Sequence, residues 1–491
     1  MLCQTRLLQA FAACCLLVGC AAGQSRPKSA AGEDTGCKPL PQTPETTGCR
    51  PPSQGTGVAA RPAYRFAAGD VALLDEVEHA AFLYFWNEVG QPAALVRDRK
   101  KAPVSSIAAV GFQLATLPVG VERGWVSHAA ARRRALSVLG ALTAHRDNRK
   151  FGVFLHFPDL HTGGPSHEGY EVLYSTVDHA LFLAGAITAG EYFGGEVKRV
   201  ADRLVAETNW RAYAVGPGGL LSMGWKPADP HDLSGAGTFL QAHWSYASDE
   251  ERLVYFLAVG APRADHAVAP ALYYRLKRPL KRHDAMSAYA VSWPGTLFTY
   301  EFSHLWIDYR SLGRDRPERF GVAAPPVDWF ENSRRAVLTH RQRCIEQAGR
   351  FKTLSQDRWG LSACAGRDGY IVPRVRPNDC DVDEWFEGTV APYAATTAIM
   401  FTPRESLAAI RAFRTLRNAD GGPMVWRDPA AGGYGFVDAF NLDQGYASDD
   451  YVGIDQGPIV LAIENVRSGL VWKLFMRSET ARRAVERLRL R

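Results

Sequence analysis

The sequence predicts an all-α protein built as a toroid, a closed ring of helix pairs. Apolar residues recur at helical spacing along much of the chain, whereas alternating runs typical of strands are short and few. Each helix must bury one face on its neighbours, so a chain of this size forms either an open solenoid or a closed toroid of helix pairs. The absence of a regular internal sequence repeat favours the toroid. The segments with helical periodicity are 71–85, 107–117, 129–142, 180–193, 253–259, 391–400, 406–416 and 459–475.

The first nineteen residues are typical of an export signal, because Arg6 precedes an apolar stretch that is too short to cross a bilayer as a helix. The sequence Leu17-Val18-Gly19-Cys20 resembles the lipobox of bacterial lipoproteins, in which the signal is cut before a cysteine that then carries lipid. The alternative is an ordinary cleaved signal with an incidental Cys20. We therefore predict a signal peptide over 1–19, lipidation at Cys20, and a periplasmic or outer-membrane location held by the lipid anchor alone.

The next segment, 20–68, is rich in Pro, Gly, Ser and Thr and poor in large aliphatic residues. It cannot bury enough apolar surface to offset the entropy of ordering, so we predict a flexible tether. Residues 69–491 contain ample apolar material for a core and no second low-complexity gap, which favours one large domain. We expect this domain to act as a monomer.

Charge and metal-ligating residues exclude several functions. The net charge of +6 is modest, and the C-terminal arginines fit a solvated helix face better than a nucleic-acid surface, since no groove-reading motif accompanies them. No CxxC or HxxxH spacing suggests zinc, so we expect neither a metal nor an organic cofactor. An oxidising compartment would permit disulfides such as Cys344 with Cys364.

Long loops rich in Gly, Trp and Tyr, at 211–245, 281–299 and 351–383, are expected to form a groove at one end of the toroid. Aromatic rings there could stack on sugars, with Trp244 and Trp385 as candidates, although tryptophan is more often packed in a core. Near the C-terminus, acids, aromatics and glycines crowd into 426–441 and 451–465, loops that lead into apolar helices. Such loops are typical of carbohydrate-cleaving sites.

Ordered segments across nearly the whole of 69–491 carry a more specific resemblance. They include Leu95-Val-Arg97-Asp98-Arg99, Ser175-Thr-Val-Asp178 and Tyr434-Gly-Phe-Val-Asp-Ala-Phe-Asn441. The others are 85–86, 106–112, 117–125, 179–185, 253–262, 303–310, 331–336, 388–392, 453–458, 464–465 and 472–475. Together they resemble the glycoamylase-type domain of glycoside hydrolase family 144, the bacterial endo-β-1,2-glucanases. The resemblance implies an (α/α)6 toroid that cleaves β-1,2-glucan internally with inversion.

Glycoside cleavage needs a carboxylic acid and a carboxylate. The resemblance implies Glu250 as the general acid and Asp438 as the general base. Ser248 and Glu251 fit a capping box at the start of the helix, which accounts for Glu251 but leaves Glu250 without a structural role. Two adjacent glutamates depart from the single Glu of the family, so the choice between them stays open, and counting back from Tyr255 favours Glu250.

Three aspartates have competing roles. Asp438 could cap a helix instead of acting as a base. Asp178 fits a capping box with Ser175, or it binds substrate hydroxyls or orients the catalytic pair. Asp455 could cap a helix that begins near Pro458, or it binds substrate close to Asp438. We predict that Asp178 and Asp455 both belong to the site.

The remaining candidates are polar residues on loops. Arg97, Asp98 and Arg99 either bind sugar hydroxyls or form an ion-pair cluster, and Glu387 is a further acid in the cleft. His156 is interpreted as a packing histidine. The alternatives to a β-1,2-glucanase are a related glycosidase or transglycosylase on another β-glucan, and a non-catalytic glycan-binding lipoprotein, which would lack the acid pair.

Overall fold

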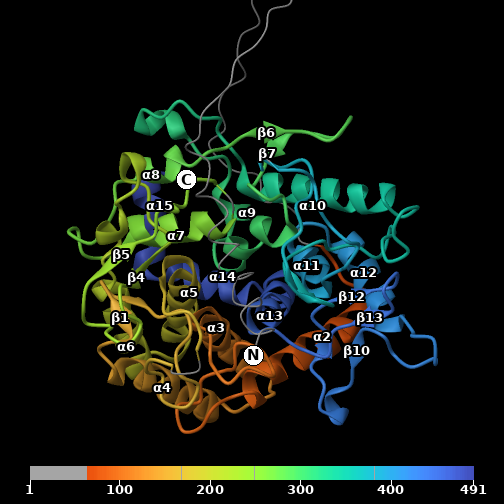
Figure 1. Ribbon diagram of the computed structural model, residues 1–491, viewed down its shortest axis with the longest axis horizontal. Coiled ribbons are helices and arrows are strands. Elements are labelled where there is room, and N and C mark those ends of the chain that lie inside the picture. The colour runs from red at the N-terminus through yellow and green to blue at the C-terminus, as the bar shows by residue number, and fades with distance from the viewer. Residues whose placement is uncertain (1–63, 167–168, 248, 381, 491) are drawn as a thin grey trace, which may run out of the picture.

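The computed structural model describes residues 64–166, 169–247, 249–380 and 382–490. Figure 1 shows a body of helices with short strand pairs around it, and this confirms the predicted mostly helical fold. The predictions on the signal peptide, on lipidation at Cys20 and on most of the tether lie outside the described residues. Within the part that is described, every helix is either too short or too polar to cross a lipid bilayer.

The α-helices are α2 (Ala68–Asn87), α3 (Ile107–Glu122), α4 (His128–Ala144), α5 (Thr176–Phe193), α6 (Gly195–Glu207), α7 (Asp249–Gly260), α8 (Ala271–Arg275), α9 (Tyr309–Leu312), α10 (Trp329–Glu346), α11 (Pro392–Thr397), α12 (Pro403–Thr415), α13 (Gly453–Arg467), α14 (Leu470–Arg477) and α15 (Glu479–Leu488). The short 3-10 helices used below are η3 (Leu297–Tyr300), η4 (Phe302–Leu305) and η6 (Ala398–Met400).

The strands form small antiparallel sheets. They are β1 (Arg149–Lys150) with β2 (Val153–Phe154), β3 (Tyr174–Ser175) with β4 (Gly224–Pro227) and β5 (Gly237–Phe239), β6 (Leu280–Lys281) with β7 (Tyr289–Ala290), β8 (Cys364–Gly366) with β9 (Gly369–Ile371), β10 (Trp426–Arg427) with β11 (Gly435–Phe436), and β12 (Phe440–Asn441) with β13 (Tyr446–Ala447).

An inner layer is formed by α3, α5, α7, η3 with η4, α11 and α13. Neighbours in this series pack on one another around much of the layer, and α13 closes it by packing on both α11 and α3. The helices α2, α4, α6, α10 and α12 lie outside and contact this layer. The chain thus alternates between an inner and an outer element, which is how a toroid of helix pairs is built.

Inner helices approach closely because glycines face one another. A Cβ atom on Gly185 of α5 would clash with the carbonyl oxygen of Gly111 in α3, and a Cβ on Gly457 of α13 would clash with the ring of Phe112. One turn earlier, a Cβ on Gly453 would lie 2.7 Å from that of Ala109. Successive turns of α13 therefore meet successive turns of α3, so these two helices run parallel and their first turns lie side by side.

The C-terminal helix α15 fills a gap in the outer layer. The segment after α7 provides only the five-residue α8, and α15 packs on α7 instead. Its buried residues form one narrow stripe, Thr480, Ala481, Ala484, Val485 and Leu488, with Arg482 among the exposed ones. The arginine-rich segment is therefore an amphipathic outer helix, as its helical spacing predicts.

Two features differ from the sequence expectations. The single helix expected over 459–475 is divided into α13 and α14, because Gly469 adopts a left-handed conformation (φ 69°) and ends the first helix. Cys344 and Cys364 are both buried and unbonded, so the disulfide suggested between them is not formed.

Candidate active site

The predicted acids gather at the first turns of the inner helices. Asp178 is the third residue of α5, Glu250 the second of α7, and Asp455 the third of α13. The first turns of α13 and α3 are adjacent, and α5 packs along α3. The outer helix α4 connects α3 to α5, so α3 and α5 begin at the same end of the ring. These first turns therefore face one end of the ring, the end to which the long loops lead.

The first pair of acids is Glu250 with Asp178. Burial, followed by the negative charge of Asp178, raises the pKa of Glu250 to about 8, so the Glu250 carboxyl is mostly protonated at neutral pH. The hydroxyl of Ser175 hydrogen-bonds to the Asp178 carboxylate, and Nε2 of His156 lies 3.5 Å from Oδ1 of Asp178. His156 thus contacts this pair and is more than a packing residue.

Ser175 does not act as the predicted capping box requires. It occupies the N-cap position of α5, yet its side chain makes no capping hydrogen bond to the backbone. Its hydroxyl is directed to the Asp178 carboxylate instead. The interaction therefore orients Asp178, and the helix start gains nothing from the side chain.

The second pair is Asp438 with Asp455, and both residues are almost completely buried. Asp438 lies between β11 and β12, where no helix begins, so the N-cap alternative for it is wrong. Burial raises its pKa to about 6, while a hydrogen bond from Asp455 lowers it. Burial and then the charge of Asp438 raise the pKa of Asp455 well above its usual value. Asp455 is therefore the protonated partner, and Asp438 ionises first.

Two further groups favour the ionised form of Asp438. The backbone N–H of Ala365 donates to Oδ2 of Asp438 at 2.6 Å, and the positive charge of Arg99 acts in the same direction. The guanidinium of Arg99 lies 5.7 Å from the centre of the Tyr370 ring. The carboxylate of Asp450 opposes them and raises the pKa of Asp438. The sequence pattern did not indicate Ala365 or Asp450, because a main-chain donor and a loop acid carry no signature.

Arg97 and Asp98 hold the loop in place. Nη1 of Arg97 donates to the carbonyl of Ala102 at 2.6 Å, and Nε of Arg99 lies 3.3 Å from Oδ2 of Asp98. The carbonyl of Asp98 accepts from the N–H of Gly453 at 2.7 Å, which ties the loop to the start of α13. The ion-pair alternative describes these contacts, and sugar binding by Arg97 and Asp98 stays a prediction.

Asp455 lies in the first turn of a helix that starts earlier than expected. Helix α13 begins at Gly453, five residues before Pro458, and its N-cap is Val452. Asp455 is therefore not the cap, and its carboxyl is turned to Asp438.

The other predicted ligands occupy different environments. Glu387 is half-buried, and its Oε1 accepts from the hydroxyl of Thr389 at 2.8 Å. Burial raises the pKa of the Cys364 thiol, and the charges of Asp438, Asp455 and Glu387 add to this, which places Glu387 on the Asp438 side.

The two tryptophans differ in exposure. The ring of Trp244 is buried, with Nε1 donating to the hydroxyl of Thr176 at 2.8 Å, whereas Trp385 is 40% exposed. Trp385 therefore offers a free ring face, and Trp244 supports the start of α5.

Among the described residues, one group brings three metal-ligating atoms within 4.8 Å of one another: His283, Asp284 and Glu346. None of the acids of the candidate active site belongs to it. Glu346 there already contacts His283 and Arg343 at 2.9 and 3.0 Å.

The model of the Glycoamylase family, described as "Putative glucoamylase", matches residues 242–479. These residues hold Glu250, Asp438 and Asp455. This part of the chain is thus similar to a glycoamylase-type domain.

The chain is 26% identical over 453 residues to the exo β-1,2-glucooligosaccharide sophorohydrolase (non-reducing end) of Parabacteroides distasonis. The match covers 85% of this chain and 58% of that protein, so the chain spans somewhat over half the length of this relative.

Solved structures share the fold. The endo-β-1,2-glucanase of Chitinophaga pinensis, in complex with sophorotriose and glucose, matches with a TM-score of 0.71 and 24% identity over 86% of this chain and 98% of that one. The β-1,2-glucanase of Parabacteroides distasonis matches with a TM-score of 0.71 and 23% identity over 87% of this chain and 60% of that one. The resemblance noted in the sequence is thereby confirmed, and so is the fold class that it implies.

Proposed function

We propose that the protein is an exported glycoside hydrolase that cleaves β-1,2-glucan internally by an inverting mechanism. The observation that carries this proposal is the opposite tuning of two carboxyl groups at one end of the ring. Glu250 keeps its proton at neutral pH and Asp438 loses its own. The printed names of the relatives, a sophorohydrolase and two β-1,2-glucanases, support the substrate.

In this mechanism Glu250 donates its proton to the glycosidic oxygen as the bond to the anomeric carbon breaks. Asp438 accepts a proton from a water molecule, whose oxygen forms the new bond to that carbon on the opposite face. Asp178 keeps Glu250 protonated, and the Asp455 proton and the Arg99 charge keep Asp438 ionised. Arg97, Asp98, Glu387 and Trp385 would contribute to sugar binding, whereas the buried ring of Trp244 supports the start of α5.

The test is hydrolysis of linear β-1,2-glucan, followed as the release of reducing sugar. The wild type should be active, and Glu250→Gln and Asp438→Asn should be nearly inactive. The control is Glu76→Gln, which changes an exposed acid of α2 and should leave the rate unchanged. Glu251→Gln tests the competing acid. An inactive wild type would exclude the substrate, and full activity of either site variant would exclude its assigned role.

The stereochemistry needs a separate measurement. Proton NMR of the first products should show the α-anomer at the new reducing end, because inversion of a β-linkage gives that anomer. A β-anomer would indicate retention and a nucleophilic carboxylate.

Exo action is the second candidate, because the relative from Parabacteroides distasonis is named an exo-acting sophorohydrolase. Product analysis separates the two. Internal cleavage gives a range of chain lengths at early times, whereas exo action gives disaccharide alone. The presence of both carboxyl pairs argues against a non-catalytic glycan-binding protein.

Export, lipidation at Cys20 and a monomeric state complete the proposal. Palmitate labelling of the full chain, compared with Cys20→Ala, should label the wild type only. Light scattering of the mature domain should give the mass of one chain.

A further inference from the structure

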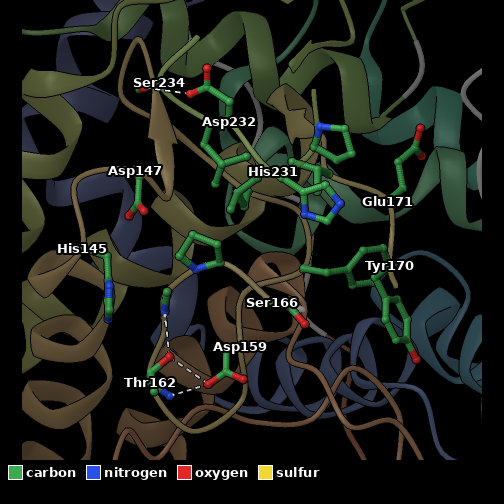
Figure 2. Close-up of a pocket in the computed structure, with 17 residues that line it drawn as sticks. His145, Asp147, Asp159, Thr162, Ser166, Tyr170, Glu171, His231, Asp232 and Ser234 are labelled. Atoms are coloured by element: carbon green, nitrogen blue, oxygen red, sulfur yellow. Dashed lines mark hydrogen bonds between the residues drawn. The ribbon is translucent and has the colours of Figure 1, made fainter. Parts of the chain in front are cut away.

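A cavity of about 640 Å³ opens beside the start of α5. Figure 2 shows its labelled side chains on several sides of the space, with His145 and Asp147 opposite Tyr170 and Glu171, and Asp232 on the loop between β4 and β5. This volume lies within the ~300–1,000 Å³ of typical ligand pockets. None of the residues expected from the sequence to bind substrate lines this cavity.

Stacked rings connect the cavity to the Glu250–Asp178 pair. Phe157 lines the cavity, and its ring stacks on that of His156 with 3.8 Å between their centres. His156 in turn lies 3.5 Å from Oδ1 of Asp178. The centre of the Tyr170 ring lies 5.0 Å from that of the Phe157 ring. Two side chains, those of Phe157 and His156, thus lie between the cavity and Asp178, the neighbour of the candidate acid.

The backbone makes the same connection. The N–H of His156 donates to the carbonyl of Leu173 at 2.8 Å. Leu173 joins the segment 170–172, part of the cavity wall, to β3. Helix α5, with Asp178 in its first turn, starts at the next residue after β3. The cavity wall is therefore joined through the backbone to the helix that carries Asp178.

The lining disfavours anions. Its described lining residues include Asp147, Asp159, Glu171 and Asp232 and no lysine or arginine. Lys226 lies 2.9 Å from Glu171 and offsets the charge of that acid. A phosphate or carboxylate ligand would meet uncompensated negative charge, so the cavity suits a neutral or a cationic ligand.

The lining also disfavours a metal ion. The one group of metal-ligating atoms found among the described residues, His283 with Asp284 and Glu346, does not belong to the cavity. Asp159 and Asp232 are already used by their own loops, since Asp159 accepts from Thr162 and Asp232 from Ser234, as the dashed lines in Figure 2 show. Dispersed carboxylates with two aromatic rings are suited instead to a polyol, because carboxylates accept hydroxyl hydrogen bonds and rings pack on C–H faces.

We propose that this cavity is a distal glucan-binding site, which holds neutral sugar units of the chain remote from the bond that is cleaved. The connection of this site to catalysis rests on the proposed function. The choice of a sugar as ligand rests on the lining of the cavity alone. Tyr170 supplies a ring face and Asp147 a hydroxyl acceptor. We expect a site at this place to strengthen the binding of long chains above all, because the side chains of Phe157 and His156 separate the cavity from Asp178.

The test uses the full mature domain carrying Glu250→Gln, so that ligands persist, and measures binding of β-1,2-linked gluco-oligosaccharides of increasing length by calorimetry. Adding Tyr170→Ala or Asp147→Asn should weaken binding of long oligosaccharides by roughly 3- to 10-fold, the range expected for one stacking or hydrogen-bonding contact. Binding of the trisaccharide should not change. Tyr64→Ala, which removes an exposed tyrosine elsewhere, is the matched control.

Equal affinity of all variants for long chains would overturn the proposal, and so would equal losses for short and long chains. Binding of a basic peptide in place of the glucan would also overturn it, because the acidic lining would then serve a cation. Circular dichroism of each variant excludes a folding defect, and Asp147→Asn provides the test if Tyr170→Ala does not fold.

Hydrolysis by the wild-type protein distinguishes the two proposals. If the wild type fails to cleave β-1,2-glucan but Tyr170→Ala and Asp147→Asn still weaken long-chain binding, the cavity is a glucan site and the proposed function is wrong. If the wild type cleaves the polymer and the pocket variants keep its kcat/KM on polymer, the distal site is wrong and the proposed function stands.

Discussion

The two carboxyl pairs of the site contain the same kind of group in opposite states. Burial and the negative charge of Asp178 both raise the pKa of Glu250 and so favour its protonated form. Around Asp438, burial is opposed by the Asp455 hydrogen bond, the Ala365 N–H and Arg99. The comparison teaches that burial raises the pKa of both carboxyl groups. The hydrogen-bond donors and charges beside each group then decide whether that group serves as an acid or as a base.

The largest effect is expected from removing the base. Asp438→Asn should lower kcat on β-1,2-glucan by ~10²- to 10⁴-fold, the usual contribution of a general base. The folded structure should persist, because the amide can still accept from Ala365. Measurements of kcat at several pH values check this prediction. If the activity of Asp438→Asn returned at higher pH, the assigned role would be contradicted.

Asp455 tests how the second pair is maintained. Asp455→Ala removes the donor that lowers the pKa of Asp438, so that pKa should rise above about 6 and the acidic limb of the kcat/KM profile should move to higher pH. Asp455→Asn keeps an N–H donor and should move the limb less. Identical limbs in the two variants would show that the hydrogen bond is not what holds Asp438 ionised.

Asp178 tests the first pair in the opposite direction. Asp178→Asn removes the negative charge that helps to raise the pKa of Glu250, so that pKa should fall from about 8 and the basic limb should move to lower pH. The acidic limb, set by Asp438, should stay where it is. A shift of both limbs would mean that the two pairs titrate as one group.

The smallest effect on chemistry is expected from the scaffold that places both pairs. Gly185→Ala should destabilise the fold by about 1–3 kcal/mol, because its Cβ meets the Gly111 carbonyl between α3 and α5. Gly140→Ala, exposed in α4 with open space around it, should stabilise by roughly 0.5–1 kcal/mol. Thermal unfolding measures both, and equal changes would contradict the close approach of α3 and α5.

Helical periodicity predicted most inner helices because they are apolar over long stretches. It missed α6 and α10, whose sequences are charged and bury only a narrow stripe, such as Val197, Val200 and Leu204 of α6. It also could not show that α15 completes the outer layer beside α7, since that contact joins distant parts of the chain.

The four acids of the candidate site could be named from the sequence through the resemblance and the helix starts. Their pairing could not, because it depends on which first turns meet in space. The Ala365 N–H and Asp450 come from separate loops and leave no pattern. The cavity was missed for the same reason, since its walls come from 145–166, 170–172 and 230–234.

The central claim is that Glu250 and Asp438 are held in opposite protonation states, and the pH dependence of kcat/KM for the wild type on β-1,2-glucan tests it most directly. The profile should be bell-shaped, because activity requires ionised Asp438 and protonated Glu250. Its limbs should lie near the two pKa values, about 6 and about 8. A profile that stays flat well above pH 8, or that falls with a limb near the ordinary carboxyl pKa, would contradict the account.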